Sequence, residues 1–260
     1  MDLGLRGKVA VITGGSEGIG KGIAQRFLEE GSSVTICARR DSVLQQAAEE
    51  LRGLTSGELL AVSADVTKPE TLANFVNTVI GRFGRIDILV NNAGRSATSA
   101  FDELTDEGWF ADLDLKLMGA VRCARLVIPQ MKLTGGGRII NITHPGGKQP
   151  GAASYPTSVS RAAGIAMTKA LSKELLPYNI LVNTVCLTSI KSAQGERTWK
   201  AEGSRGTLEE YWRDRAKEHP LGRLGEPSDA GALVAFLASE CAAFITGTAI
   251  NLDGGLSNVV

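Results

Sequence analysis

The segment Lys8–Gly20, KVAVITGGSEGIG, decides the fold. Its first half, Lys8–Thr13, is a short apolar run rich in β-branched residues, which predicts a buried strand. Four glycines follow, and three of them, Gly14, Gly18 and Gly20, have the spacing of a phosphate-binding loop. Their spacing lets the chain turn tightly and approach a pyrophosphate group without a Cβ in the way. The next segment, Lys21–Glu30, is a predicted helix whose free amides would face the phosphates. Strand, glycines and helix in this order predict a dinucleotide-binding unit.

A second predicted strand, Ser33–Ala38, ends in two basic residues, Arg39 and Arg40. In a unit of this kind the strand end, about twenty residues beyond the glycines, faces the adenosine ribose. A carboxylate there would repel a phosphate, but the last strand residue is an alanine. This favours NADP(H) over NAD(H), although two solvated arginines would give the same pattern. Glu17 argues against the preference, because a basic residue in the loop would help to neutralise the 2′-phosphate.

The charge balance excludes several classes of partner. Among 260 residues, 28 are Lys or Arg and 28 are Asp or Glu, so no overall field attracts nucleic acid or an anionic membrane. No apolar run approaches the length of a membrane span, and the N-terminal sequence MDLGLRGK lacks the apolar core of a signal peptide. We therefore expect a cytoplasmic protein that binds a small molecule and contacts neither nucleic acid nor membrane.

Cysteine and histidine give no sign of a metal site. The four cysteines stand among apolar neighbours without a CxxC spacing, which indicates buried thiols. The two histidines, His144 and His219, are far apart in the sequence.

The rest of the chain alternates between predicted strands and helices. Repeated units of this type predict an α/β fold in which helices cover both faces of a doubly wound parallel sheet, within one domain spanning residues 1–260. The further predicted strands are Leu59–Ser63, Ile86–Val90, Gly137–Ile142, Ile180–Cys186 and Thr248–Leu252. The further predicted helices are Gln45–Leu51, Pro69–Arg82, Asp106–Met131, Ala152–Leu175 and Ala230–Ala238.

One polar segment, 188–220, interrupts this alternation. It contains Trp199, Tyr211 and Trp212. We interpret it as a helical insertion over the ligand crevice at the carboxyl ends of the strands. Its aromatic residues are equally consistent with substrate contact and with packing beneath an ordinary loop.

Several motifs resemble those of the short-chain dehydrogenase/reductase family along essentially the whole chain. Thr13–Gly20 matches TGxxxGIG, Asp65 and Val66 match the dipeptide whose acid usually holds the adenine amino group, and Asn91–Gly94 matches NNAG. The C-terminal part matches in PLGRLGEP at Pro220–Pro227 and in DGG at Asp253–Gly255. The resemblance implies a seven-stranded Rossmann fold. It also implies a homotetramer built through the two long helices and the C-terminal strand.

The resemblance also implies a set of cofactor contacts. The residues expected to touch NADP(H) are Gly14, Ser16, Gly18, Ile19, Gly20, Arg39, Arg40, Asp65, Val66, Asn92, Ala93, Gly94, Arg161 and Ile190.

The family usually reacts through a serine, a tyrosine, a lysine four residues after the tyrosine, and an asparagine on the preceding long helix. Without gaps, NITH at Asn141–His144 places His144 on the serine. In the same alignment Thr157 falls on the tyrosine, Arg161 on the lysine and Lys116 on the asparagine. All four positions are then substituted.

Tyr155 lies two residues before the expected tyrosine position. A frame that used it would put Val159 where the lysine belongs. On a helix, two residues turn a side chain by about 200°. Tyr155 would therefore reach the site only if the preceding loop re-aimed it.

Two hypotheses about function remain open. In the first, the chain is an NADP(H)-dependent oxidoreductase for a carbonyl and alcohol pair, with His144 and Lys116 in place of the tyrosine and lysine. In the second, it binds the nucleotide without hydride transfer, as a regulatory or scaffold protein, or catalyses a non-redox lyase or isomerase step. Both residues also have an interpretation without a catalytic role: His144 would be a turn residue, and Lys116 a solvated helix residue.

Overall fold

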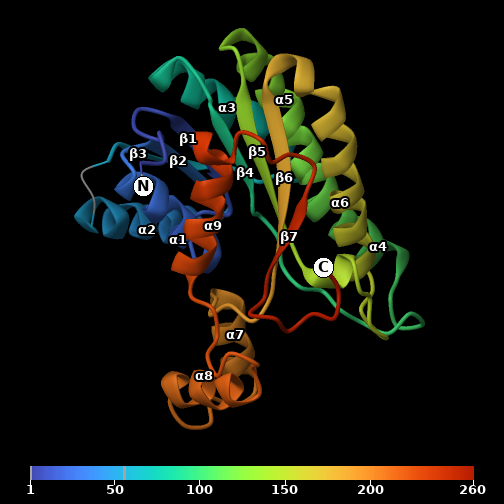
Figure 1. Ribbon diagram of the computed structural model, residues 1–260. Helices are drawn as coiled ribbons and strands as arrows, with labels where there is room; N and C mark the ends of the chain where they lie inside the picture. The colour runs from blue at the N-terminus through green and yellow to red at the C-terminus, as the bar shows by residue number, and fades with distance from the viewer. Residues whose placement is uncertain (1, 55–56) are drawn as a thin grey trace.

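Seven parallel strands form the centre of the structure, a computed structural model that describes residues 2–54 and 57–260 (Figure 1). They lie in the order β3-β2-β1-β4-β5-β6-β7, and every neighbouring pair is parallel. The order reverses between β1 and β4, which opens a crevice at the carboxyl ends of these strands. The strands are β1 (Val9–Thr13), β2 (Ser33–Ala38), β3 (Leu59–Ser63), β4 (Ile88–Asn91), β5 (Gly137–Thr143), β6 (Ile180–Leu187) and β7 (Ala249–Leu252).

Helices cover both faces of the sheet, so the expected doubly wound α/β domain is confirmed. The side chains of β1 alternate between the faces: Ala10 and Ile12 pack with α1, α2 and α9, whereas Val9 and Val11 pack with α3 and α5. The helices are α1 (Gly18–Glu29), α2 (Asp41–Leu54), α3 (Pro69–Phe83), α4 (Asp106–Leu113), α5 (Gly119–Leu133), α6 (Thr157–Glu174), α7 (Ala193–Ala201), α8 (Leu208–Lys217) and α9 (Pro227–Ala238).

The predicted long helix 106–131 contains an irregularity at its centre. Between α4 and α5, residues Asp114–Met118 form a π-helical turn, closed by the Gly119 amide, which donates to the Asp114 carbonyl. Such wide turns are frequent at functional sites. Lys116 lies within this turn.

The second predicted long helix, Ala152–Leu175, is wrong at its start, because α6 begins only at Thr157. Ala153 has a left-handed backbone with φ of 51°, and Pro156 has no N–H to continue a helix through this point. The Tyr155 carbonyl instead accepts a hydrogen bond of 2.7 Å from the Ser99 amide. Tyr155 therefore lies in a loop.

The segment 188–220 contains α7 and α8, which project from the sheet in Figure 1. Their aromatic side chains pack within the segment: the rings of Tyr211 and Trp212 are 5.0 Å apart, and Trp212 covers Gly195. Gln194 of α7 accepts a hydrogen bond of 2.9 Å from the Ser96 amide, which ties α7 to the loop after β4.

In the part of the chain that the structure describes, none of the helices combines the length and the apolar character needed to cross a bilayer. Within the same residues, no three metal-ligating side chains gather into a possible metal site.

Candidate active site

The glycine loop after β1 is shaped by positions that exclude a side chain. Gly14 and Gly18 have φ of 66° and 49°, in the left-handed region that favours glycine. At Gly20, a Cβ would lie 2.2 Å from the carbonyl oxygen of Gly14. The loop can therefore close tightly on the N-terminus of α1, where free amides bind phosphate.

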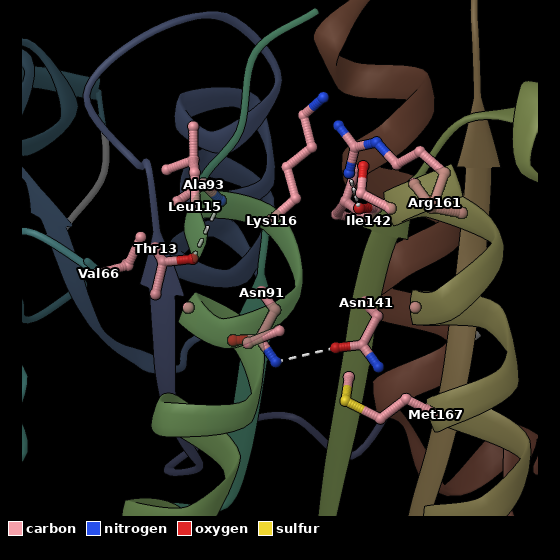
Figure 2. A pocket seen from close by; sticks show the side chains of 15 residues that line it. Thr13, Val66, Asn91, Ala93, Leu115, Lys116, Asn141, Ile142, Arg161 and Met167 are labelled. Carbon is pink, nitrogen blue, oxygen red and sulfur yellow. Dashed lines mark hydrogen bonds between the residues drawn. The ribbon is translucent and has the colours of Figure 1, made fainter. Parts of the chain in front are cut away.

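The NNAG loop after β4 braces this glycine loop. The Asn92 side chain donates to the carbonyls of Thr13 and Gly14, each at 3.0 Å. The Thr13 hydroxyl accepts from the amides of Asn92 and Ala93 at 3.0 and 3.1 Å, a contact drawn in Figure 2 for Ala93. The two loops thus form one rigid wall of the crevice.

Both arginines after β2 are engaged by carboxylates. Arg40 forms an ion pair with Glu17 of the glycine loop, and Arg39 lies 3.8 Å from Asp65 after β3. A phosphate at this strand end would compete with Glu17 for Arg40. The Asp65 carboxylate also accepts from the amide and hydroxyl of Thr67, at 2.9 and 2.8 Å.

The remaining expected cofactor contacts lie around the same crevice. Val66 is buried against Gly119 of α5, and Ser16 is buried within the glycine loop. Ile19 packs on the core beneath α1. Ile190 follows β6 and forms a backbone bridge with Gly225.

A buried ion pair lies at the centre of the candidate catalytic residues. Lys116 Nζ is 2.5 Å from Asp112 Oδ1, and the two side chains are 1% and 2% exposed. The ammonium also donates to the Thr157 hydroxyl at 2.8 Å, and Asp112 Oδ2 accepts from the Ser160 hydroxyl at 2.6 Å. The structure therefore brings together two residues that the ungapped alignment places at catalytic positions. Lys116 comes from the π turn, and Thr157 is the first residue of α6.

Burial shifts the protonation of this lysine. Desolvation is the largest cause that lowers the Lys116 pKa to about 8; the hydrogen bond that Lys116 donates to Asp112 raises it, and the charges of Arg161 and Arg95 lower it further. An ammonium with a pKa of about 8 can release a proton near neutral pH.

Arg161 lies beside this cluster. Its Nη1 donates to the Ile142 carbonyl at 2.9 Å, and its Nη2 approaches Gly94, where a Cβ would be 3.2 Å away. Burial lowers the pKa of Arg161, but an arginine keeps its charge in proteins. Figure 2 shows the Lys116 ammonium and the Arg161 guanidinium at the same end of the pocket.

His144 stands at the mouth of the crevice, after β5. The Gly146 amide donates to its Nδ1 at 2.9 Å, so the proton of the neutral ring lies on Nε2, which contacts the Thr188 hydroxyl at 3.1 Å. Partial desolvation lowers its pKa, as do the charges of Arg161 and then Lys116, although the residue as a whole is exposed. At neutral pH the imidazole is therefore uncharged.

Tyr155 points into an aromatic group. Its ring lies 5.5 Å from that of Phe101, edge to face, and 5.9 Å from that of Trp109. Among the described residues, the Tyr155 ring contacts Phe101 and Trp109, and its backbone pairs with Ser99. None of these three residues belongs to the Lys116 cluster.

A cavity of about 20 Å³ lies beneath Lys116, enough for one water molecule. Its floor contains Asn91 and Asn141, whose side chains share a hydrogen bond of 2.8 Å (Figure 2). Among residues 2–54 and 57–260, neither the buried Asn91 Oδ1 nor the buried Thr143 hydroxyl has a hydrogen-bond partner.

The sequence interpretation missed Asp112 and Ser160. A signal was present for the first, since Asp112 stands four residues before Lys116, the spacing of a helical ion pair. Ser160 carried no signal of its own.

The chain resembles known proteins over nearly its full length. Residues 14–257 match the family model described as enoyl-(acyl carrier protein) reductase. L-Sorbose reductase from Gluconobacter frateurii, solved with NADPH and L-sorbose, superposes with a TM-score of 0.94 at 36% identity, covering 100% of both chains. A putative ketoacyl reductase of granaticin polyketide synthase from Streptomyces violaceoruber is 36% identical over 96% of this chain and 93% of its own.

A further solved structure is the NADPH-bound short-chain oxidoreductase from Pseudomonas aeruginosa PAO1, described as containing an atypical catalytic center. It has a TM-score of 0.90 at 33% identity and covers 97% of this chain and 98% of its own. Fold, glycine loop and relatives together define a nucleotide-dependent oxidoreductase. The chain belongs to the short-chain dehydrogenase/reductase family, whose members use NAD(P)H and a small-molecule substrate.

The buried ion pair can be tested by mutation. Asp112→Asn leaves the Lys116 ammonium without its carboxylate, and we expect the free energy of unfolding to fall by about 3–5 kcal/mol. Adding Lys116→Met should restore most of it, because uncharged groups of similar volume often replace a buried pair without loss. Denaturant unfolding at neutral pH measures both variants.

Asp114→Asn is the matched control, since Asp114 forms a partly exposed pair with Arg122. It should change the unfolding free energy by less than about 1 kcal/mol. Equal stability of Asp112→Asn and Asp114→Asn would contradict the importance of the buried pair.

Proposed function

We propose that the chain is an NADP(H)-dependent oxidoreductase that interconverts a carbonyl compound and an alcohol through non-standard catalytic residues. The observation that carries this proposal is the Lys116 ammonium, buried and hydrogen-bonded to Thr157 at 2.8 Å beside the crevice. Bound NADPH would supply a hydride, and a carbonyl carbon that accepts it leaves an alkoxide oxygen. That oxygen needs positive charge and a proton.

The residues of the site can supply both. Lys116, with a pKa of about 8, donates toward the Thr157 hydroxyl, whose own proton is free to pass to the substrate oxygen. The fixed charge of Arg161 stabilises the same oxygen or binds the nicotinamide ribose, as the family lysine does. His144, uncharged and exposed at the mouth of the crevice, is the second candidate for proton transfer.

The pH dependence of reduction distinguishes Lys116 from His144 as the proton donor. A donor must be protonated to react, so kcat/KM is constant below its pKa and falls above it. With Lys116 as donor, the fall occurs as the pH rises through about 8. With His144 as donor, it occurs below the ordinary imidazole pKa of about 6.5.

Variants test the same assignment. Lys116→Met should lower kcat by roughly a hundredfold or more. Thr157→Val should lower kcat more than Thr157→Ser does, because serine keeps the hydroxyl. Lys116→Arg keeps the positive charge but does not titrate near pH 8, so the fall of kcat/KM near that pH should disappear. A hundredfold loss on His144→Ala with full activity in Lys116→Met would reverse the roles. Tight NADPH binding without oxidation by any carbonyl compound would favour the nucleotide-binding or non-redox alternative.

The proposed preference for NADP(H) rests on Arg39 and Arg40. A charge-assisted bond to phosphate contributes about 1.5–3 kcal/mol, so we expect NADPH to bind at least roughly tenfold more tightly than NADH. Glu17→Gln frees Arg40 and should tighten NADPH binding with little effect on NADH. Arg40→Gln should weaken NADPH binding selectively. Calorimetry with each nucleotide measures these affinities without catalysis.

Glu58→Gln is the matched control for Glu17→Gln, because Glu58 also pairs with an exposed arginine, Arg82, away from β2's end. It should leave both affinities unchanged. Equal affinity of the wild-type chain for NADPH and NADH would refute the preference.

We also propose a homotetramer. Large apolar side chains are exposed on the helices that the family uses for assembly, Phe110 on α4 at 70% and Val159 on α6 at 42%, and at the C-terminus, Val260 at 110%. Light scattering at micromolar concentration should report a tetramer, and Phe110→Glu should weaken it. Leu54→Glu on α2, also an exposed site, should not. A stable wild-type monomer would exclude this assembly.

A further inference from the structure

Two arginines at the active site have no carboxylate partner among residues 2–54 and 57–260. Arg161 uses Nη1 to donate to the Ile142 carbonyl, a neutral group, and its Nε is buried without a partner. Arg95 is exposed in the loop after β4 and forms no ion pair within the same residues. Arg95 directly follows Gly94, where a Cβ would lie 3.2 Å from Arg161 Nη2 and 3.7 Å from Lys116 Cγ, so the two arginines belong to one site.

The nearby carboxylate is fully occupied. Asp112 Oδ1 pairs with Lys116, and Asp112 Oδ2 accepts from Ser160. Lys116 and Asp112 neutralise each other, so Arg161 and Arg95 leave an excess of positive charge at the crevice. Removing a charge from water without a counterion costs several kcal/mol, a cost that applies to the half-buried Arg161 and not to the exposed Arg95.

The nucleotide does not remove this excess at the catalytic end. Its pyrophosphate would lie at the glycine loop, on the N-terminus of α1. A ribose hydroxyl would give Arg161 a hydrogen bond but no negative charge. The missing anion therefore belongs to the substrate.

We infer that the substrate carries a carboxylate beside its reacting carbonyl, held by Arg161 and Arg95 while Lys116 and Thr157 face the carbonyl oxygen. Guanidinium groups bind carboxylates through short charge-assisted hydrogen bonds, with a geometry that an ammonium does not offer. Within the described chain, Nη1 is the donor of Arg161 that makes a hydrogen bond, while the buried Nε and the Nη2 along the loop at Gly94 make none. This inference rests on the proposed function and names its substrate class as short oxo acids.

The test compares short 2-oxo and 3-oxo carboxylates with the carboxamides of the same shape. Reduction by NADPH should show a kcat/KM roughly tenfold or more higher for each preferred acid than for its amide. Arg95→Gln should lower this ratio, mainly through KM, and Arg95→Lys should retain part of it. Arg82→Gln removes one exposed positive charge from α3 and should leave the ratio unchanged. Amides turned over as well as acids, or a ratio unaffected by Arg95→Gln, would overturn the inference.

Binding separates this inference from the proposed function. The fluorescence of enzyme-bound NADPH is titrated with each acid and each amide. Acids that bind in preference to amides but are not reduced support the anion site and refute hydride transfer. Reduction of neutral carbonyls, with no acid bound or reduced, overturns the anion site and leaves the oxidoreductase intact. Binding of neither acid nor amide also overturns the anion site.

Discussion

The buried pair between Lys116 and Asp112 is the constraint on which the rest of the site depends. Two charges out of water must satisfy each other and their remaining hydrogen-bonding groups, or the pair destabilises the fold. Here the first turn of α6 completes the arrangement, with Thr157 on the ammonium and Ser160 on the carboxylate. The same contacts hold the first turn of α6 against α4 and the π turn, and so position Lys116 and Thr157 relative to each other.

The site combines two parts, the glycine loop with the NNAG loop that braces it, and the charged cluster around Lys116. In the first, backbone geometry dominates: glycines without side chains and amide donors from Asn92 shape a loop for phosphate. In the second, charged side chains dominate, since burial lowers the Lys116 pKa to about 8 beside the fixed charge of Arg161. The ordinary pKa values of a phenol and of an ammonium are both about 10, so the pKa of either group must fall before it exchanges a proton readily near neutral pH.

Much of the fold could be predicted because its signals are local. The predicted strands Ser33–Ala38 and Leu59–Ser63 have the same first and last residues as β2 and β3. Their ends could be predicted because each apolar run begins and ends at a turn residue. The start of α6 could not be predicted, because Tyr155 pairs with Ser99, a residue far away in the sequence. The spacing of Asp112 and Lys116 was visible, yet helical pairs of this kind usually face solvent, and only tertiary packing buries this one.

Because of the π turn at Asp114–Met118, the position of Lys116 depends on the number of residues in this segment. The strands of the sheet have no such dependence. A π turn holds one residue more than an α turn, and each helical residue advances the face by about 100°. Loss of a single residue here would return the segment to regular α geometry. Either Lys116 would swing away from Thr157, or α5 would rotate its apolar face off the sheet. The position of Lys116 therefore depends on one inserted residue, as much as on the side chains around it.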